Sequence, residues 1–215
     1  MAPEIPHLIY VHGLFMNGSE SLVLRRRLLR DFGAPLQAHA FRYHSTTSSM
    51  ADIAARLQAY VRELKPATLH LVAHSLGGLV VHRFLEHYPA QPPGRVVLMG
   101  SPIVASRAAV AIARVKWAAA VVGRCVAEEL FAERPRRWVA ERDLGVIAGT
   151  KPMGLGRLFT HFDEESDGTV AVSETRIPGA RDCLSLPVSH TGLLLSARVA
   201  RETAAFLQTG KFAGR

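Results

Sequence analysis

The sequence of 215 residues contains two cysteines, Cys125 and Cys183, and no uninterrupted apolar run of the roughly 20 residues that a membrane-spanning helix needs. Two cysteines do not suggest a disulfide framework, and we expect both to be free thiols. The most apolar long stretch, 108–122, is interrupted by Arg114 and Lys116. The N-terminus has no basic and then apolar leader, which predicts a cytoplasmic protein unless a leader has been removed.

Acidic residues are scarcer than basic ones, 18 against 26, so the formal net charge is +8. This balance suits a nucleic-acid-binding protein, but the basic residues are spread along the chain, and no recognised binding module or aromatic platform accompanies them. We interpret them as solvated helix faces and expect no nucleic-acid partner. Weak attraction to anionic membrane surfaces or anionic substrates stays open as the alternative.

Strand-type and helix-type patterns alternate along the chain, and 48% of the residues are hydrophobic, enough for one sizeable core. We therefore expect a single domain over 1–215. The expected strands are 7–11, 36–43, 69–72, 95–100, 144–148 and 180–186, and the expected helices are about 20–32, 50–64, 76–88 and 191–208. This order predicts an α/β fold with a mostly parallel sheet, helices on both faces, and ligand-binding loops at the carboxyl ends of the strands.

The ten residues 69–78 carry the strongest local signal. A short apolar strand pattern leads into Ser75, a helical pattern follows at once, and the small residues Ala73 and Gly77 stand two positions before and after the serine. This arrangement fits a nucleophile elbow, whose strained turn leaves no room for larger neighbours. The plain alternative is a strand-to-helix turn with an N-capping serine.

A serine hydroxyl needs a base within hydrogen-bond reach, and the base needs an acid that orients it. Among the ten histidines, His190 stands between the last strand and the last helix, which places it at the same edge of the sheet as Ser75. His161, in the loop after the preceding strand, is the competitor. We interpret His82 and His87 as ordinary helix-face residues.

The acid is expected in the loop after the penultimate strand. Asp167 is the first candidate, because the glycine that follows it permits a tight turn; an ordinary Asp-Gly turn is the plain alternative. Asp163 is the runner-up. Asp182 begins the last strand and therefore falls at the opposite edge of the sheet.

Two backbone amides must also face the oxyanion that develops during attack on a carbonyl. The amide of Leu76 directly follows the predicted nucleophile and begins a helix, whose dipole favours negative charge. The second amide should come from the loop after the first strand, where His12 and Gly13 lead to Leu14. No histidine pair or His/Cys cluster has metal-ligand spacing with a supporting carboxylate, so we expect no metal.

Four motifs occur in a characteristic order: VHGL at 11–14, AHSLG at 73–77, SDGTV at 166–170 and SHTG at 189–192. With them the sequence resembles the α/β-hydrolase superfamily, most of all its small bacterial serine lipases and esterases, over about residues 7–207. The resemblance implies a minimal sheet of about six strands and a cofactor-free hydrolase that forms a covalent acyl-enzyme. Alanine at the first small position of the elbow, where glycine is commoner, departs from the family pattern.

The resemblance also implies that 103–140 forms a short helical cap or lid, although its apolar residues suit an ordinary packing helix equally well. Residues expected to contact substrate are His12, Gly13, Phe15, Met16, His74, Trp117 and Phe159. Their apolar share predicts short- to medium-chain esters or lipids as substrates. Acyl transfer, thioester hydrolysis, amide hydrolysis and a non-catalytic binding role remain alternatives, and the oligomeric state is left open.

Overall fold

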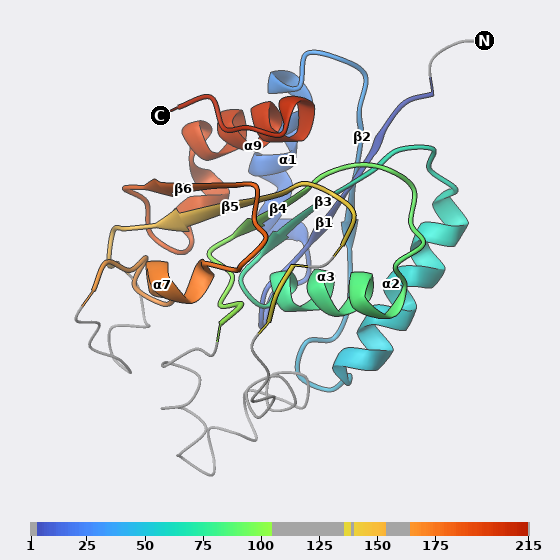
Figure 1. Ribbon diagram of the computed structural model, residues 1–215, viewed down its shortest axis with the longest axis horizontal. Coiled ribbons are helices and arrows are strands. Elements are labelled where there is room, and N and C mark those ends of the chain that lie inside the picture. Colours follow the sequence, from blue (N-terminus) through green and yellow to red (C-terminus); the bar gives the residue numbers. More distant parts are fainter. Residues whose placement is uncertain (1–3, 105–135, 139, 154–163, 215) are drawn as a thin grey trace.

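The computed structural model describes residues 4–104, 136–138, 140–153 and 164–214. In this part of the chain six strands form one wholly parallel sheet in the order β2-β1-β3-β4-β5-β6 (Figure 1). The strands are β1 (His7–Val11), β2 (Gln37–Phe41), β3 (Leu69–His74), β4 (Val96–Met99), β5 (Leu144–Gly149) and β6 (Asp182–Leu186). The predicted parallel α/β sheet is confirmed.

Helices cover both faces of the sheet, as the sequence predicted (Figure 1). Helices α2 (Met50–Leu64) and α3 (Leu76–His87) lie on one face, and α1 (Leu22–Asp31) and α9 (Ala197–Thr209) lie on the other. The short elements are η1 (Ser19–Ser21), α7 (Val172–Thr175) and α8 (Gly192–Leu195). Alternate residues of the buried strand β1 serve separate cores: Ile9 packs with the α2/α3 side and Tyr10 with the α1/α9 side.

Helix α2 illustrates why these segments become helices. Its apolar residues recur at helical spacing and are buried against the sheet. The Oγ of Ser49 accepts a hydrogen bond from the amide of Asp52 at 3.1 Å and so caps the first turn. Lys65 ends the helix in a left-handed conformation, one residue before Pro66. The predicted range 50–64 is confirmed.

The C-terminal segment differs from the single helix that we predicted over 191–208. It forms α8 and α9, separated by Ser196, whose backbone is extended (φ −78°, ψ 125°). The Ser196 Oγ accepts a hydrogen bond from the amide of Val199 at 3.3 Å and caps α9, while Arg27 of α1 donates to the carbonyl oxygen of Leu195. The chain after His190 is therefore a separate helical turn, anchored on α1.

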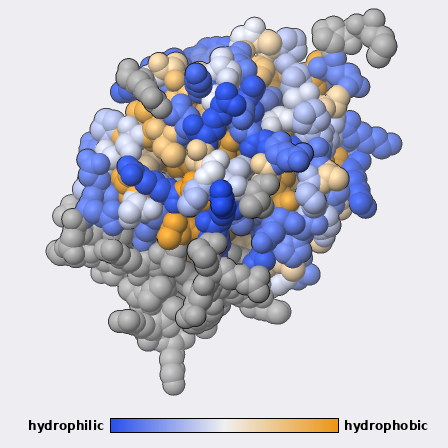
Figure 2. Space-filling view, viewed as in Figure 1, coloured by the Kyte–Doolittle hydropathy of each residue, from blue (hydrophilic) through white to orange (hydrophobic). Residues whose placement is uncertain are grey.

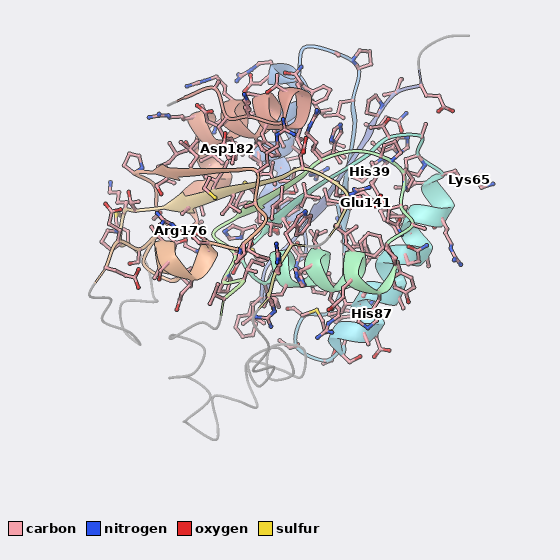
Figure 3. The ribbon with its side chains drawn as sticks, viewed as in Figure 1. His39, Lys65, His87, Glu141, Arg176 and Asp182 are labelled. Carbon is pink, nitrogen blue, oxygen red and sulfur yellow. The ribbon has the colours of Figure 1, made fainter. Side chains whose placement is uncertain are left out.

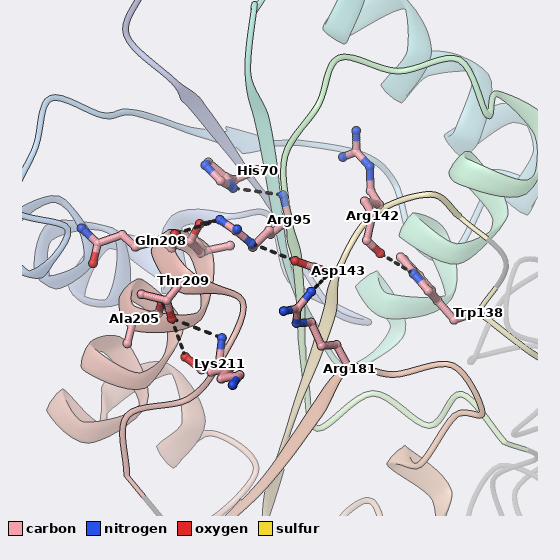
Figure 4. A network of polar contacts seen from close by, with 11 residues as sticks. His70, Arg95, Trp138, Arg142, Asp143, Arg181, Ala205, Gln208, Thr209 and Lys211 are labelled. Atoms are coloured by element: carbon pink, nitrogen blue, oxygen red, sulfur yellow. Dashed lines mark hydrogen bonds and ion pairs between the residues drawn. The ribbon is translucent and has the colours of Figure 1, made fainter.

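A network of paired polar groups closes the amino edge of the sheet (Figure 4). Asp143 accepts hydrogen bonds from Arg95 Nε at 3.1 Å and Arg181 Nη1 at 2.8 Å. Arg95 also donates to the carbonyl oxygen of Leu207 at 2.8 Å, near the end of α9, and its amide donates to His70 Nδ1 at 3.1 Å. Burial acts to raise the pKa of Asp143, but hydrogen bonds and charge from both arginines outweigh it and hold that pKa below its usual value.

On the face in Figure 2, hydrophilic residues predominate and apolar residues lie in small patches between them. No helix within the described ranges is long and apolar enough to cross a membrane. Cys183 is a free thiol, whereas Cys125 lies outside the described residues, as do 105–135 and 139 of the predicted cap.

Candidate active site

The predicted elbow begins where β3 ends at the carboxyl edge of the sheet. Ser75 has φ 55° and ψ −127°, a conformation that costs a non-glycine residue about 1–3 kcal/mol. Its amide donates to the carbonyl oxygen of Met99 at 3.0 Å, which fixes the turn against β4. A Cβ at Gly77 would lie 2.3 Å from the carbonyl oxygen of Val11, so only glycine lets α3 approach β1 this closely.

The loop after β1 lies directly beside the elbow. A Cβ built on Gly13 would stand 3.0 Å from the Cβ of Ser75, which puts the backbone before Leu14 in contact with the predicted nucleophile. Within the described part of the chain, no protein acceptor takes the amide hydrogen of Leu14 or Leu76. Two donors therefore remain available next to the serine, as an oxyanion site requires.

His12 holds this loop in place from inside the protein. Its ring is fully buried and stacks on Tyr43, with 4.0 Å between ring centroids. Since Nε2 accepts from the Tyr43 amide at 3.3 Å, we assign the proton to Nδ1, which donates to the carbonyl oxygen of Gly13 at 2.8 Å. Burial lowers the pKa of His12, although its backbone hydrogen bonds act in the opposite direction. The neutral ring fixes the peptide that precedes Leu14.

Buried Asp167 and partly buried His190 are paired at the same edge. The Asp167 Oδ2 lies 2.7 Å from His190 Nδ1, and the carboxylate is 1% exposed. Its other oxygen, Oδ1, accepts from the amides of Thr169 at 2.9 Å and Val170 at 2.8 Å. These bonds satisfy a buried carboxylate that would otherwise be costly, and they direct Oδ2 toward the imidazole.

A backbone contact joins the base to the acid loop as well. The amide of His190 donates to the carbonyl oxygen of Asp167 at 2.9 Å. A Cβ at Gly149, the last residue of β5, would lie 2.7 Å from the Cβ of Asp167, so the aspartate packs on the end of that strand. Asp167 thus stands at the carboxyl edge, where the sequence predicted an acid.

His74, the residue before Ser75, connects the elbow to His190. Its Nε2 lies 3.0 Å from the carbonyl oxygen of His190, and the two rings are 4.5 Å apart between centroids. Burial, and then the neighbouring charge of His190, lower the pKa of His74 well below its ordinary value. A neutral His74 therefore donates to the backbone of His190 and holds it next to the residue that precedes the predicted nucleophile.

Gly100, after β4, provides the space behind this pair. Its φ is +54°, and a Cβ at this position would lie 2.9 Å from Asp167 Oδ2 and 3.2 Å from His190 Nδ1. Sequence reasoning missed this residue, although a glycine directly after a buried strand was a signal for it. Tyr43 and Ser45 were also missed, because nothing local marks their contacts with a loop about 30 residues earlier.

The remaining predicted residues are distributed as follows. Phe15 and Met16 follow Leu14, and Phe15 is 64% exposed with φ 60°. The rings of His12 and His74, expected to contact substrate, are instead enclosed and bonded to backbone groups. Trp117, Phe159, His161 and Asp163 lie outside the described residues.

The rejected candidates lie away from the pair. Asp182 begins β6 and accepts from the amide of Phe212 at 2.9 Å, near the end of the chain (Figure 3). His82 and His87 belong to α3, and Nδ1 of His87 lies 3.1 Å from the carbonyl oxygen of Arg83 in its own helix. Among the described side chains, no group of three or more potential ligands is placed to hold a metal ion.

Comparison with known proteins gives a consistent picture of the fold. Residues 8–205 match the model of the alpha/beta hydrolase family. The mature lipase BlEst2 from Bacillus licheniformis is similar in structure, with a TM-score of 0.74 and 19% identity over 98% of this chain and 94% of that chain. The metagenomic carboxyl esterase MGS0156 has a TM-score of 0.66 and 19% identity over 97% of this chain and 76% of its own.

A third similar structure is the RedJ thioesterase of the prodiginine pathway in Streptomyces coelicolor, with a TM-score of 0.64 and 14% identity over 93% of this chain and 89% of that chain. Comparison with curated proteins gave no significant match. At such identities the solved structures establish the fold alone. The family model covers most of the chain, and the chain belongs to the alpha/beta hydrolase family.

Proposed function

We propose that this protein is a serine hydrolase that cleaves carboxylic esters through an acyl-enzyme. The observation that carries the proposal is the 2.7 Å contact between buried Asp167 and His190, at the sheet edge where Ser75 is held in a strained turn. An acid, a base and a hydroxyl from three separate loops are the groups that acyl transfer requires.

In the proposed reaction, the Ser75 hydroxyl attacks the ester carbonyl while His190 Nε2 accepts its proton. Asp167 keeps the proton on Nδ1 and stabilises the imidazolium that forms. The amides of Leu14 and Leu76 donate to the oxyanion, and each such donor typically contributes about 100- to 1,000-fold in rate. His190 returns the proton to the leaving alcohol, and a water molecule then releases the acyl group by the same steps.

Esters of short- to medium-chain acids are the proposed substrates. Exposed Phe15 and partly buried Met16 supply apolar surface next to the proposed oxyanion donor. Two of the similar structures are described as a lipase and a carboxyl esterase. Thioester hydrolysis is the second candidate, supported by the likeness to the RedJ thioesterase, because the same acyl-enzyme serves both reactions.

The direct test uses Ser75→Ala, with Ser185→Ala as a control at an exposed serine. We expect wild type and the control to hydrolyse 4-nitrophenyl esters of graded chain length and to react with a fluorophosphonate. Ser75→Ala should do neither and should keep its melting temperature. Fluorophosphonate labelling that persists in this variant would contradict the assignment, and a folded wild type inert to every ester and thioester would favour a binding role.

A further inference from the structure

A hollow next to the loop that carries the proposed oxyanion donor Leu14 is lined in part by two arginines to which the proposed reaction assigns no role. Its volume is about 480 Å³, and it lies at the carboxyl ends of β1 and β2. Phe15 and Met16 form part of its wall, and Arg42 and Arg56 also line it. The hollow thus combines apolar side chains with two arginine residues.

The hollow is continuous with the loop that carries the proposed oxyanion donor. Phe15 directly follows Leu14, so their Cα atoms are about 3.8 Å apart. The amide of Phe15 donates to Ser45 Oγ at 3.1 Å, and the hydroxyl of Tyr43 donates to the carbonyl oxygen of His12 at 2.6 Å. Since Ser45 and Tyr43 also line the hollow, the residues that shape it are those that fix the loop.

The charge of the hollow is of one sign. None of the described residues that line it is acidic, and the side chains of Arg42 and Arg56 are in no ion pair within the described part of the chain. Asp52, one turn before Arg56 on α2, lies 2.6 Å from Ser49 Oγ at the helix N-terminus instead. Arg56 Nη2 donates to the carbonyl oxygen of Arg42 at 3.4 Å, which uses one of the five N–H donors of its guanidinium group. The other donors of Arg56 and the guanidinium group of Arg42 are available to an anion from outside, and planar guanidinium groups suit carboxylate and phosphate oxygens.

The backbone conformation at Phe15 exposes the apolar wall of the hollow to solvent. Phe15 has φ 60°, a left-handed conformation that is uncommon for a large side chain, and its ring is 64% exposed. The Ser45 hydrogen bond holds this conformation by fixing the Phe15 amide. The hollow therefore presents an exposed aromatic ring together with two arginines.

We propose that this hollow is a substrate subsite for esters that carry an anionic group, a carboxylate or a phosphate, beside an apolar segment. The proposal rests on the proposed ester hydrolysis at Ser75 and specifies its substrate class. The anion would contact Arg42 and Arg56, the apolar segment would lie on Phe15, and the ester carbonyl would reach the amides of Leu14 and Leu76.

The test compares matched neutral and anionic esters. On the acyl side the pair is 4-nitrophenyl butyrate and mono-4-nitrophenyl glutarate; on the alcohol side it is methyl 4-acetoxybenzoate and 4-acetoxybenzoate, with 4-acetoxyphenyl phosphate to distinguish the two anions. For each pair, the measured quantity is the kcat/KM of the anionic ester divided by that of the neutral ester. We expect this ratio to fall about 5- to 10-fold in the double variant Arg42→Gln/Arg56→Gln for the acyl pair or the alcohol pair, whichever places its anion in the hollow, as loss of two exposed ion pairs predicts. The change should lie in KM and should shrink at high salt.

The control is Arg26→Gln/Arg62→Gln, which removes the same charge from exposed positions elsewhere. Arg62 lies six residues after Arg56 on α2, about 9 Å along the helix axis and on a different face. Because each ratio is compared between proteins, differences in intrinsic ester reactivity cancel. The proposal is overturned if the double variant keeps the wild-type ratio on both sides, or if the control lowers it equally.

A binding measurement separates this proposal from the proposed function. Calorimetric titration of the Ser75→Ala protein with 4-acetoxybenzoate should detect binding that weakens about 5-fold or more when Arg42 and Arg56 are also replaced by glutamine. Such binding without any Ser75-dependent hydrolysis in wild type would refute ester hydrolysis and retain the subsite. If wild type and the double variant hydrolyse the esters with the same anionic-to-neutral ratios of kcat/KM, ester hydrolysis is retained and the subsite is refuted.

Discussion

Both edges of the sheet carry polar groups, but those at the amino edge are paired with one another, whereas two amides at the carboxyl edge are without acceptors in the described part of the chain. At the amino edge Asp143 is bonded to Arg95 and Arg181 (Figure 4). Arg142 donates to two backbone carbonyl oxygens, so these charged groups are occupied by protein partners. At the carboxyl edge, within the described residues, the amides of Leu14 and Leu76 have no acceptor. What distinguishes the carboxyl edge is that these two amides lie beside a serine in a strained turn.

Backbone conformation separates the edges in the same way. The carboxyl edge holds two non-glycine residues with positive φ, Ser75 and Phe15, and both lie at the proposed reaction site. The third such residue in the described ranges, Lys65, ends α2 as an ordinary helix terminus. Strain at this edge therefore accompanies the groups proposed to react, as expected where surrounding structure enforces an unfavourable geometry for chemistry.

The largest effect should come from Asp167→Asn. The side-chain amide of the variant would present an N–H donor to His190 Nδ1. This favours the tautomer with its proton on Nε2, which cannot accept the serine proton, so we expect kcat to fall by about 1,000- to 10,000-fold. The fall in kcat is measured by steady-state hydrolysis of a 4-nitrophenyl ester. An unchanged kcat would exclude Asp167 as the acid and return attention to Asp163.

The next effect should come from Gly100→Ala, compared with Gly33→Ala. Both glycines have positive φ, but a Cβ at Gly33 would have no neighbour within 4 Å, whereas at Gly100 it would press on Asp167 and His190. Both variants should lose about 1 kcal/mol or more of unfolding free energy, since both place an L side chain in a left-handed conformation. Only Gly100→Ala should also lower kcat/KM, by about 100-fold. Equal kcat/KM values in the two variants would show that Gly100 does not affect the geometry of the proposed site.

At the amino edge, His70 should make stability depend on pH. Burial, followed by the charges of Arg95 and Arg142, lowers the pKa of His70 to about 4. Between about pH 6.5 and 4 the unfolded chain binds this proton more readily, so stability is full above pH 6.5 and falls as the pH decreases, by about 2 kcal/mol at pH 5.

His70→Asn keeps an acceptor for the Arg95 amide and removes the titrating group. Urea unfolding of both proteins at several pH values should show a shallower loss of stability in the variant below pH 6.5. Some slope should remain, because His12 and His74 also have lowered pKa values. Parallel curves for the two proteins would show that His70 does not titrate differently on folding.

The smallest effect should come from Asp143→Asn, the amino-edge counterpart of Asp167→Asn. It removes two partly exposed ion pairs, which are worth about 1 kcal/mol together, and leaves the carboxyl edge untouched. Chemical denaturation should detect the loss of stability, while kcat should stay within about twofold of wild type. A large fall in kcat here would mean that the two edges are coupled.

Much of this arrangement could be predicted because parallel sheets impose it. Strand and helix patterns gave the elements, and parallel strands bring the loops that contain Ser75, Asp167 and His190 to one edge. Helix α2 was predicted with its bounds because Ser49 and Pro66 mark its ends locally. The contact of Asp167 with His190 agrees with that expectation, while their roles stay a proposal.

Other features depend on contacts that no local pattern reveals. The break at Ser196 interrupts an apolar sequence of helical type, and part of what holds it is the hydrogen bond from Arg27, far away in the chain. His74 was expected near substrate, but β3 lies in the middle of the sheet and its residues are enclosed on both faces. Its ring therefore contacts the His190 backbone, a relation visible only in three dimensions.

The turn at Ser75 has an evolutionary consequence. Glycine would adopt φ 55° and ψ −127° without steric strain, whereas the strain at serine costs about 1–3 kcal/mol out of a typical total stability of 5–15. Selection for folding alone would replace it. A descendant of this chain with glycine at position 75 would therefore be expected to lack the proposed covalent chemistry, and to melt at a higher temperature than its ancestor.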